Sequence, residues 1–536
     1  MHIDASPSLA ADTAASRASL DAAAPLIADG EIRGTSPADG SPLTPVAVTP
    51  VAEVRAIVAR CREAQRVHAA RSVEVRAALL RRFAEALLRR GEETVAVLQH
   101  ECGKLEAEAR LVEVLPTADL AAFWCDEGPA LIAPHEPELD AISYPGKRAT
   151  VERAPRGVVA LITPWNFPVA IPLRTIFPAL LAGDGVVLKP SEYAPRSGAL
   201  IAEAAREVYG DDLVPLVQGG GDVGAALVAA GVDAVVFTGS VPTGRKVAHA
   251  AADALVPVSL ELGGKDAAIV LDDADLERTA AGLVWGAFAN AGQNCAAIER
   301  VYVTPGVAAQ LEARVVALAQ ALVLGRDVGP MTTPAQLALV ARHVDAAVAA
   351  GARALTGGAR DPRPGLWYPP TVLVDVPSDA DVLVAETFGP VLPIVRVASA
   401  EAALAAANAS PFGLTGSVWT RDLERGEHLA RQLRTGVAMV NNHSFSGAIP
   451  SLPWTGVGES GYGVTNSAHA LDLLTRPRAL LVDASRAKRE LWWHPYTPAL
   501  ATVARALSTL RSAAAIGAKF RAVGALLGGF LKRWKV

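Results

Sequence analysis

The chain has few cysteines, only a small excess of charge and no long apolar run. Its 536 residues include four cysteines, Cys61, Cys102, Cys125 and Cys295. These are too few for a disulfide framework in a chain of this length, which favours a reducing compartment. With 50 basic and 55 acidic residues the formal net charge is −5, whereas nucleic-acid-binding proteins are normally basic. We therefore expect no nucleic-acid partner.

Sorting and membrane-spanning signals are also missing. The first 25 residues are small and polar, and they lack the charged start and the continuous apolar run of a secretory signal. No uninterrupted apolar stretch approaches the ~20 residues that a membrane-spanning helix needs. We expect a cytoplasmic protein whose residues 1–30 are disordered.

What the chain does contain is material for large packed cores, since 51% of its residues are hydrophobic and 20% are charged. Residues 51–127 repeat apolar side chains at a spacing of three to four, which predicts helices. Beyond them, short apolar runs such as GVVALI and AVVFT alternate with helical segments, and a second such set begins near residue 263. This alternation predicts an α/β fold with parallel sheets.

Three polar residues near predicted strands have the chemistry of a covalent catalytic site. Cys295 lies among small residues in NAGQNCAAIER, which leave a substrate room to reach the sulfur. Asn166 in ITPWNFP offers an amide donor for an oxyanion, and Glu261 in LELGGK offers a carboxylate base. Each also has an ordinary structural interpretation: a buried thiol, a helix cap and an ion-pair partner.

Seven short motifs occur in one order along the chain. They are PWNFP at 164–168, KPSE at 189–192, FTGS at 237–240, ELGGK at 261–265, GQNC at 292–295, ETFGPV at 386–391 and GVGESGYG at 456–463. This set, with 34 residues from Glu261 to Cys295, resembles the aldehyde dehydrogenase superfamily over residues 35 to 483.

The resemblance implies the aldehyde dehydrogenase fold, in a homodimer or homotetramer. The implied parts are a Rossmann-type NAD-binding domain at 31–135 and 155–262, a catalytic α/β domain at 263–467, an oligomerisation element at 136–154 and 468–484, and a tail at 485–536.

The resemblance also implies a mechanism. Cys295 resembles the nucleophile that attacks a small-molecule aldehyde to form a thiohemiacetal, with Asn166 and the Cys295 backbone N–H stabilising the oxyanion. After hydride transfer leaves a thioester, Glu261 resembles the base that activates water to release the acid. This carboxylate favours hydrolysis over the alternative of a coenzyme A-acylating enzyme. The intact set of three residues opposes the other alternative, a catalytically silent member with a binding role. No metal site is expected.

The usual Gly-x-Gly-x-x-Gly fingerprint of a dinucleotide site does not follow any predicted strand. In the family that the chain resembles, FTGS and the helix after it take this role, so Ser240 is expected at the pyrophosphate. The other implied cofactor contacts are Ile162, Trp165, Lys189, Glu192, Gly239, Gly263, Glu386 and Phe388. Because a carboxylate at 192 accepts ribose hydroxyls and repels a 2′-phosphate, we expect a preference for NAD, with NADP left open.

Arg174 occupies a position that lines the substrate tunnel in the family and is arginine in succinate-semialdehyde and lactaldehyde dehydrogenases. It predicts a substrate carboxylate, as in succinate semialdehyde, and the alternative is an internal salt bridge or a surface residue. Phe167 is the other expected substrate contact. Ser446 and Ser451 are candidates for the serine that assists this arginine in some members, and Thr175 stands where many members have lysine.

The tail is basic. Residues 491–536 contain seven basic and no acidic side chains. Its large apolar residues recur at a spacing of three to four: Ile516, Phe520, Val523, Leu527, Phe530 and Trp534. This pattern is that of a basic amphipathic helix, which predicts weak peripheral contact with an anionic membrane. Four glycines between 517 and 529 weaken a helix and invite close packing, so we favour the alternative that the tail packs on its own oligomer.

Overall fold

The structure is a computed structural model. It describes residues 26–140, 144, 146–486, 490, 493–513 and 515–533. The disordered segment expected over residues 1–30 therefore lies outside the described residues up to residue 25, and Trp534 of the tail lies outside them too.

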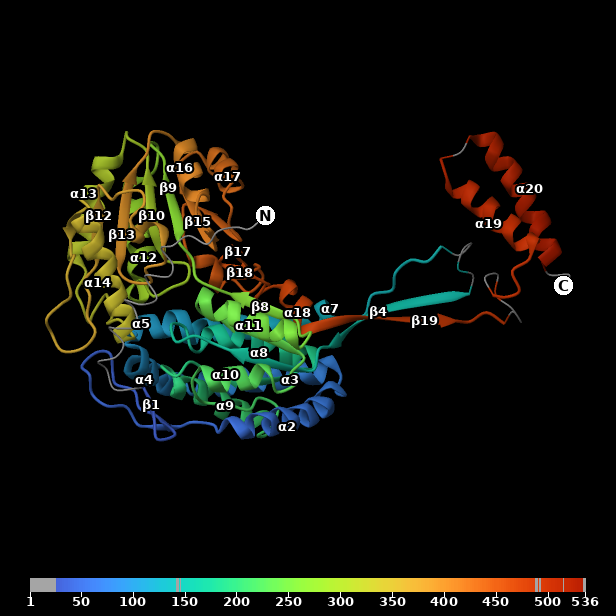
Figure 1. The fold of residues 1–536 in the computed structure, drawn as a ribbon, viewed down its shortest axis with the longest axis horizontal. Coiled ribbons are helices and arrows are strands. Elements are labelled where there is room, and N and C mark those ends of the chain that lie inside the picture. The colour runs from blue at the N-terminus through green and yellow to red at the C-terminus, as the bar shows by residue number, and fades with distance from the viewer. Residues whose placement is uncertain are drawn as a thin grey trace. The chain divides into compact units, whose positions relative to one another are not determined.

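The chain divides into two compact units. The larger is formed by residues up to 134 together with residues 152–478, and the smaller by residues 135–151 and 479–536 (Figure 1). Each is described by itself below.

A five-stranded sheet carries the first part of the larger unit. Its strands in spatial order are β18 (Gly461–Tyr462), β8 (Val258–Glu261), β7 (Ala234–Thr238), β5 (Val158–Ile162) and β6 (Gly185–Lys189). Strand β18 runs antiparallel to β8, and the other pairs are parallel. Strands β5 and β6 are buried along their whole length, as expected where helices cover both faces of a parallel sheet.

Alternating side chains of β5 reach the two faces of this sheet. Val159 and Leu161 join the core on one face, and Val158 and Ala160 join the core on the other. The first core includes α3 (Val73–Arg89), α6 (Leu115–Asp126), α8 (Ala170–Ala182) and α9 (Pro195–Tyr209), and the second includes α2 (Val51–Ala69), α10 (Gly221–Val228) and α11 (Val241–Asp253).

A seven-stranded sheet carries the second part of the larger unit. Its spatial order is β11 (Arg353–Thr356), β12 (Thr371–Val374), β13 (Val391–Arg396), β10 (Ile298–Val303), β9 (Asp266–Val270), β15 (Thr415–Trp419) and β16 (Val437–Val440). Only β11 is antiparallel to its neighbour among these described strands. One face packs against α12 (Leu276–Phe288), α13 (Ala308–Ala321) and α14 (Pro334–Ala349), and the other against α16 (Ala400–Asn408) and α17 (Leu423–Ala430). The predicted α/β fold with parallel sheets is confirmed.

Short elements connect these layers. The strands are β1 (Ile27–Ala28), β2 (Glu31–Ile32), β3 (Val46–Ala47), β14 (Phe412–Gly413) and β17 (Val457–Gly458). The α-helices are α4 (Gly91–Cys102), α5 (Glu106–Ala109), α7 (Gly128–Ile132), α15 (Asp381–Val384) and α18 (Leu471–Leu474). One π-helical turn, η1 (Arg110–Val114), and three 3₁₀ turns, η2 (Ala289–Gly292), η3 (Phe445–Ala448) and η4 (Ala468–Ala470), complete the set described.

The smaller unit contains part of a two-stranded ribbon and a helical hairpin. The ribbon pairs β4 (Lys147–Pro155) with β19 (Thr475–Asp483). The hairpin consists of α19 (Pro498–Arg511), which Thr497 caps, and α20 (Ile516–Arg533). The basic amphipathic helix expected from the sequence falls on α20.

Candidate active site

The carboxyl ends of four parallel strands gather most of the motifs that the sequence singles out. Asn166 follows β5, Glu192 follows β6, Ser240 follows β7, and Glu261 ends β8. Ligands of open parallel sheets bind outside this edge. Cys295 comes from the other sheet, where it lies just before β10.

A strained turn presents Cys295. Asn290 and Ala291 have φ values of 54° and 55°, and Gly292 follows with 70°, so the chain bends sharply after α12. A Cβ on Gly292 would lie 2.2 Å from the carbonyl oxygen of Gly389, which leaves room only for glycine. Cys295 is partly exposed, whereas the other three cysteines are buried.

The surroundings of the Cys295 thiol disfavour its charged form. Removal from bulk water, followed by the nearby Glu261 carboxylate, raises the pKa of the Cys295 thiol to about 12, and the Arg174 guanidinium opposes this rise. The thiol is therefore protonated at neutral pH, and it must lose its proton before or during attack on a substrate.

Glu261 is buried and held by two hydroxyls. Thr465 Oγ1 donates to one carboxylate oxygen, and Thr238 Oγ1 donates to the other at 3.4 Å. Burial raises the pKa of Glu261, and the hydrogen bond from Thr465 and the charge of Arg174 oppose this. A Cβ on Gly264 would lie 2.6 Å from the Cys295 carbonyl oxygen, so the loop after Glu261 packs on the backbone of Cys295. The structure thus brings the predicted base and nucleophile together.

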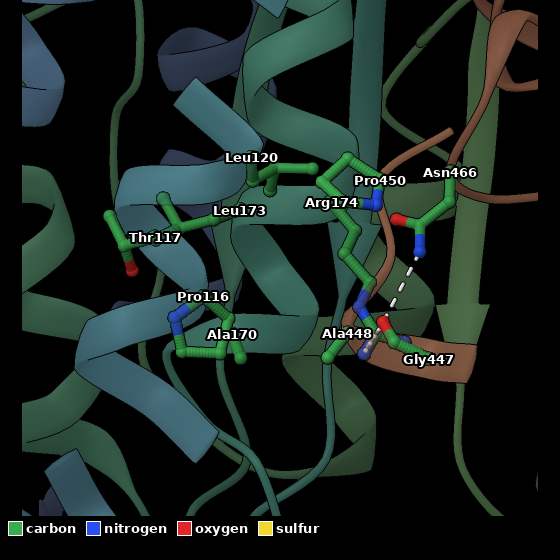
Figure 2. A pocket seen from close by; sticks show the side chains of 10 residues that line it. All are labelled: Pro116, Thr117, Leu120, Ala170, Leu173, Arg174, Gly447, Ala448, Pro450 and Asn466. Atoms are coloured by element: carbon green, nitrogen blue, oxygen red, sulfur yellow. Dashed lines mark hydrogen bonds between the residues drawn. The ribbon is translucent and has the colours of Figure 1, made fainter. Parts of the chain in front are cut away.

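Arg174 lies on α8 and lines a cavity that opens to solvent (Figure 2). The cavity is lined by Pro116, Thr117, Leu120, Ala170, Leu173, Arg174, Gly447, Ala448, Pro450 and Asn466. Arg174 Nη2 donates to the Gly447 carbonyl oxygen at 2.7 Å, and Asn466 Nδ2 donates to the same oxygen at 3.3 Å. The guanidinium lies 5.6 Å from the ring centroid of Trp454.

The alternative internal salt bridge of Arg174 is not seen. Within the described ranges no carboxylate pairs with Arg174, and its one hydrogen-bond partner is a neutral carbonyl. Ser446 Oγ and Asn466 Oδ1 are buried polar atoms with no hydrogen-bond partner among the described residues. Asn466 lines the cavity, whereas the two candidate serines, Ser446 and Ser451, do not. Unpaired buried polar groups beside a free charge suit a polar ligand group.

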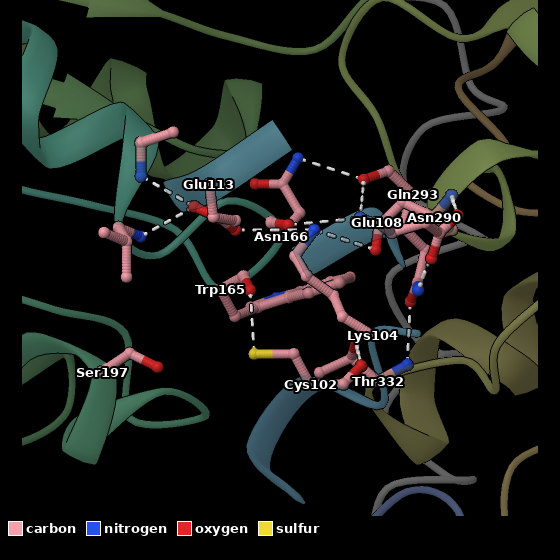
Figure 3. Close-up of polar contacts among 12 residues, drawn as sticks. Cys102, Lys104, Glu108, Glu113, Trp165, Asn166, Ser197, Asn290, Gln293 and Thr332 are labelled. Carbon is pink, nitrogen blue, oxygen red and sulfur yellow. Dashed lines mark hydrogen bonds and ion pairs between the residues drawn. The ribbon is translucent and has the colours of Figure 1, made fainter. Parts of the chain in front are cut away.

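Asn166 contacts the loop that carries Cys295 (Figure 3). Its Nδ2 donates to the Gln293 carbonyl oxygen at 3.2 Å. Asn290 Nδ2 in turn donates to the Asn166 carbonyl oxygen at 3.2 Å and to the Gln293 carbonyl oxygen at 3.0 Å. An amide group has two N–H donors, so the second N–H of Asn166 is free for another acceptor.

A buried ion pair that the sequence analysis missed supports this arrangement. Lys104 Nζ lies 3.5 Å from Glu113 Oε1, and both side chains are fully buried. The same ammonium donates to Asn290 Oδ1 at 3.0 Å and lies 4.1 Å from the ring centroid of Phe167. Glu113 Oε2 accepts the backbone N–H groups of Val169 and Ala170 at the start of α8. The pair therefore contacts the end of the Asn166 loop through Glu113 and its middle through Lys104.

No local pattern could have revealed this pair. Glu113 is directed inward by the π-helical turn η1, and Lys104 follows Gly103, which ends α4 in a left-handed conformation. In the sequence both look like ordinary charges in a helical region rich in Arg and Glu.

Four of the implied cofactor contacts, Trp165, Gly263, Glu386 and Phe388, lie near the loop after Glu261 or the ETFGPV motif. The rings of Trp165 and Phe388 meet edge to face with centroids 5.6 Å apart. Glu386 Oε1 accepts the Gly264 N–H at 3.0 Å, and a Cβ on Gly263 would lie 2.2 Å from the Glu386 carboxylate. Burial, followed by the charge of Glu299, raises the pKa of Glu386 to about 8.

The remaining implied cofactor contacts lie at the ends of β5, β6 and β7. Ile162 ends β5, and buried Lys189 ends β6, where its Nζ lies 3.8 Å from partly exposed Glu192. Ser240 is the exposed N-cap residue of α11, but its hydroxyl does not cap the helix and donates instead to Thr243 Oγ1 at 3.1 Å. The first N–H groups of α11 thus have no side-chain acceptor. Gly239 donates its N–H to the Glu261 carbonyl oxygen at 3.0 Å.

Among the described residues no group of His, Cys, Asp and Glu is arranged to hold a metal ion.

Comparisons with known proteins agree with this geometry. The model of the aldehyde dehydrogenase family matches residues 27–480. The chain is 36% identical over 471 residues to 4,4'-diapolycopene aldehyde oxidase of Methylomonas sp., covering 87% of this chain and 88% of that protein. It is 36% identical over 433 residues to a Mycobacterium ulcerans protein provisionally named succinate-semialdehyde dehydrogenase [NADP(+)] 2, covering 79% and 83%.

A solved structure gives the same answer. PnpE in complex with nicotinamide adenine dinucleotide superposes with a TM-score of 0.82 at 33% identity, covering 86% of this chain and 96% of that one. The chain therefore belongs to the aldehyde dehydrogenase family and is an oxidoreductase that acts on aldehydes.

Proposed function

We propose that the protein oxidises an aldehyde to its carboxylic acid with NAD as hydride acceptor and water as acyl acceptor. The observation that carries this proposal is the closeness of the buried Glu261 and the partly exposed Cys295, since the loop after Glu261 packs on the backbone of Cys295. A nucleophile and a base close together suit a covalent acyl intermediate that water then cleaves.

The residues act in sequence. The Cys295 sulfur gives its proton to solvent and bonds to the aldehyde carbon, which gives a thiohemiacetal whose oxyanion accepts hydrogen bonds from the free Asn166 N–H and the Cys295 backbone N–H. A bound NAD would supply a hydride acceptor, and loss of the hydride from this carbon leaves a thioester on Cys295. Glu261 then removes a proton from water, the resulting hydroxide attacks the thioester, and the acid leaves as the sulfur regains its charge.

The residues present fit this cofactor. The uncapped N-terminus of α11 offers backbone N–H groups to a pyrophosphate, and the partly exposed Glu192 offers a carboxylate to ribose hydroxyls. The same carboxylate disfavours the 2′-phosphate of NADP. We expect kcat/KM with NAD to exceed kcat/KM with NADP. Glu192→Ser should reduce the ratio of these two values, because it removes the carboxylate that disfavours the 2′-phosphate. An equal or higher kcat/KM with NADP for the unaltered enzyme would overturn this preference.

For the substrate we propose an aldehyde that carries a carboxylate, as succinate semialdehyde does. Arg174 supports this, because it supplies a cation with no paired carboxylate among the residues that line the cavity. The mainly apolar lining of the same cavity favours a second candidate, a neutral aldehyde.

The deciding experiment compares kcat/KM for succinate semialdehyde with that for neutral aldehydes of similar length, followed by NADH formation. Product analysis with and without coenzyme A separates hydrolysis from acyl transfer, and NADH formed without coenzyme A supports the water pathway. Absence of NADH with every aldehyde would instead indicate a silent member with a binding role.

We also propose the division of labour that the sequence analysis predicts. Residues 31–135 and 155–262 bind NAD, residues 263–467 carry Cys295, and residues 136–154 with 468–484 join copies of the chain. The exposed apolar residues Leu480, Leu481 and Val482 of β19 support the last of these roles. Light scattering of the purified protein tests for the expected dimer or tetramer.

A further inference from the structure

The two helices of the hairpin in the smaller unit, α19 and α20, pack against each other. Leu500, Val503 and Ala506 of α19 and Ala522 of α20 are buried. A Cβ on Gly529 would lie 2.6 Å from Val503 Cγ2, so this glycine allows the two helices to approach closely. At Gly529 the close packing expected from the glycines therefore occurs between α20 and α19. A Cβ on Gly524 or Gly528 would meet open space.

A second apolar face of α20 is left uncovered. Ile516, Phe520, Val523 and Leu527 are exposed to 74%, 73%, 43% and 61%. Their spacing of four, three and four residues places them on one side of the helix. Large side chains exposed in a row are unusual on a soluble surface and mark a contact site. We call these four residues the α20 stripe.

The segment that carries the α20 stripe has charged residues of one sign only. Residues 491–536 contain seven Lys and Arg and no Asp or Glu, so the other residues carry 43 basic against 55 acidic side chains, a net charge of −12. Lys519 and Arg521 lie on α20 itself. Of the described basic side chains of the hairpin, only Arg511 is paired with a carboxylate, that of Asp140.

We propose that the hairpin docks through the α20 stripe on a lipid surface with anionic headgroups. A membrane interface takes apolar side chains and cations together, since the stripe enters the acyl boundary while the cations remain among the headgroups. Within the described residues no helix is long and apolar enough to cross a membrane, which fits a helix lying in the interface. Exposed Trp493 and Tyr496 of the same unit are of the type found at that depth.

The hairpin of a second copy is a less favourable partner for the α20 stripe, because it would bring seven positive charges against seven more. The acidic body of a second copy remains the competing partner, and the experiment separates it from lipid. Docking on lipid does not depend on the reaction, so its test does not depend on the catalytic roles proposed above.

The test uses the purified full-length protein in flotation with vesicles of phosphatidylcholine alone or mixed with phosphatidylglycerol. We expect co-flotation with the anionic vesicles only, and its loss as salt is raised. Lys519→Glu with Arg521→Glu should weaken the partition about 30-fold or more, because two attractive charges become repulsive. Phe520→Ser with Leu527→Ser should weaken it as well.

Leu255→Ser is the matched control, since Leu255 is 93% exposed on the larger unit and should not affect flotation. NADH formation and thermal unfolding show that each variant is folded. Failure of the unaltered protein to float, equal flotation with neutral vesicles, or flotation that survives both double substitutions would overturn the proposal. So would a change of oligomeric state in the stripe variant, measured by light scattering, because the stripe would then contact a second copy.

Discussion

Replacing Lys104 by methionine tests whether a buried ion pair controls the catalytic amide. The substitution keeps the length of the side chain and removes the ammonium that contacts Glu113, Asn290 and the ring of Phe167. Glu113 then remains buried with one oxygen unpaired, and breaking such a pair costs about 3–5 kcal/mol of stability. Adding Glu113→Gln removes the stranded charge, so the double variant should recover most of that loss.

The Lys104 substitution should lower the reaction rate by more than the loss of folded protein alone would cause. Asn290 loses the donor that orients its amide, and this amide holds the carbonyls of Asn166 and Gln293. If Asn166 loses its alignment fully, the oxyanion loses one donor, which is worth about 10²–10³ in rate. In the double variant Lys104→Met with Glu113→Gln we therefore expect the reaction rate to fall by up to about 10²–10³-fold.

The assay is the rate of the first NADH turnover at saturating NAD, measured in a double-mutant cycle with Asn166→Ala. If Lys104 acts through Asn166, the Lys104 substitution should cost little further rate once the amide is gone. Losses that multiply in the combined variant would refute the reasoning and reduce the pair to a structural role. Unfolding temperatures recorded in parallel show which variants are folded at the assay temperature.

Other expectations concern the nucleophile, the base and the substrate. Cys295→Ala should abolish aldehyde oxidation while NAD binding, measured by calorimetry, persists; unchanged turnover would contradict the covalent step. Glu261→Gln should give a burst of NADH followed by slow turnover, if acylation is fast, because hydrolysis of the thioester loses its base; a parallel fall of both phases would assign Glu261 another role. Burial raises the pKa of Glu261 and the Thr465 hydroxyl lowers it, so activity should rise with pH through this pKa, and Thr465→Val should move that rise to higher pH while Thr465→Ser does not. Arg174→Leu should cost about 2–5 kcal/mol, or roughly 30-fold to several thousand-fold in kcat/KM, for succinate semialdehyde. Arg174 also lowers the pKa values of Glu261 and Cys295. The loss is therefore measured as the ratio of kcat/KM for the acidic aldehyde to kcat/KM for the neutral aldehyde at several pH values. An unchanged ratio would show that Arg174 does not recognise the substrate.

The sequence by itself determined the fold class and the order of the motifs. Parallel strands covered on both faces must be apolar throughout, so runs such as those of β5 and β6 are readable without a structure. Polar residues at or shortly after the carboxyl ends of parallel strands, as Glu261 and Asn166 are, meet at the same edge of the sheet. The helical pattern of α20 was likewise predictable from its spacing, since a period of 3.6 residues is a local property.

Only the tertiary structure decided what surrounds these residues. Thr465 is 204 positions from Glu261, and Asn290 is 186 positions from Lys104, so neither contact leaves a local pattern in the chain. The same holds for Arg174, whose carbonyl partner lies 273 positions away on Gly447. A charged residue in a helix has the same local appearance whether it faces water or a buried partner, because its partner is set by the packing of distant elements and not by its neighbours in sequence.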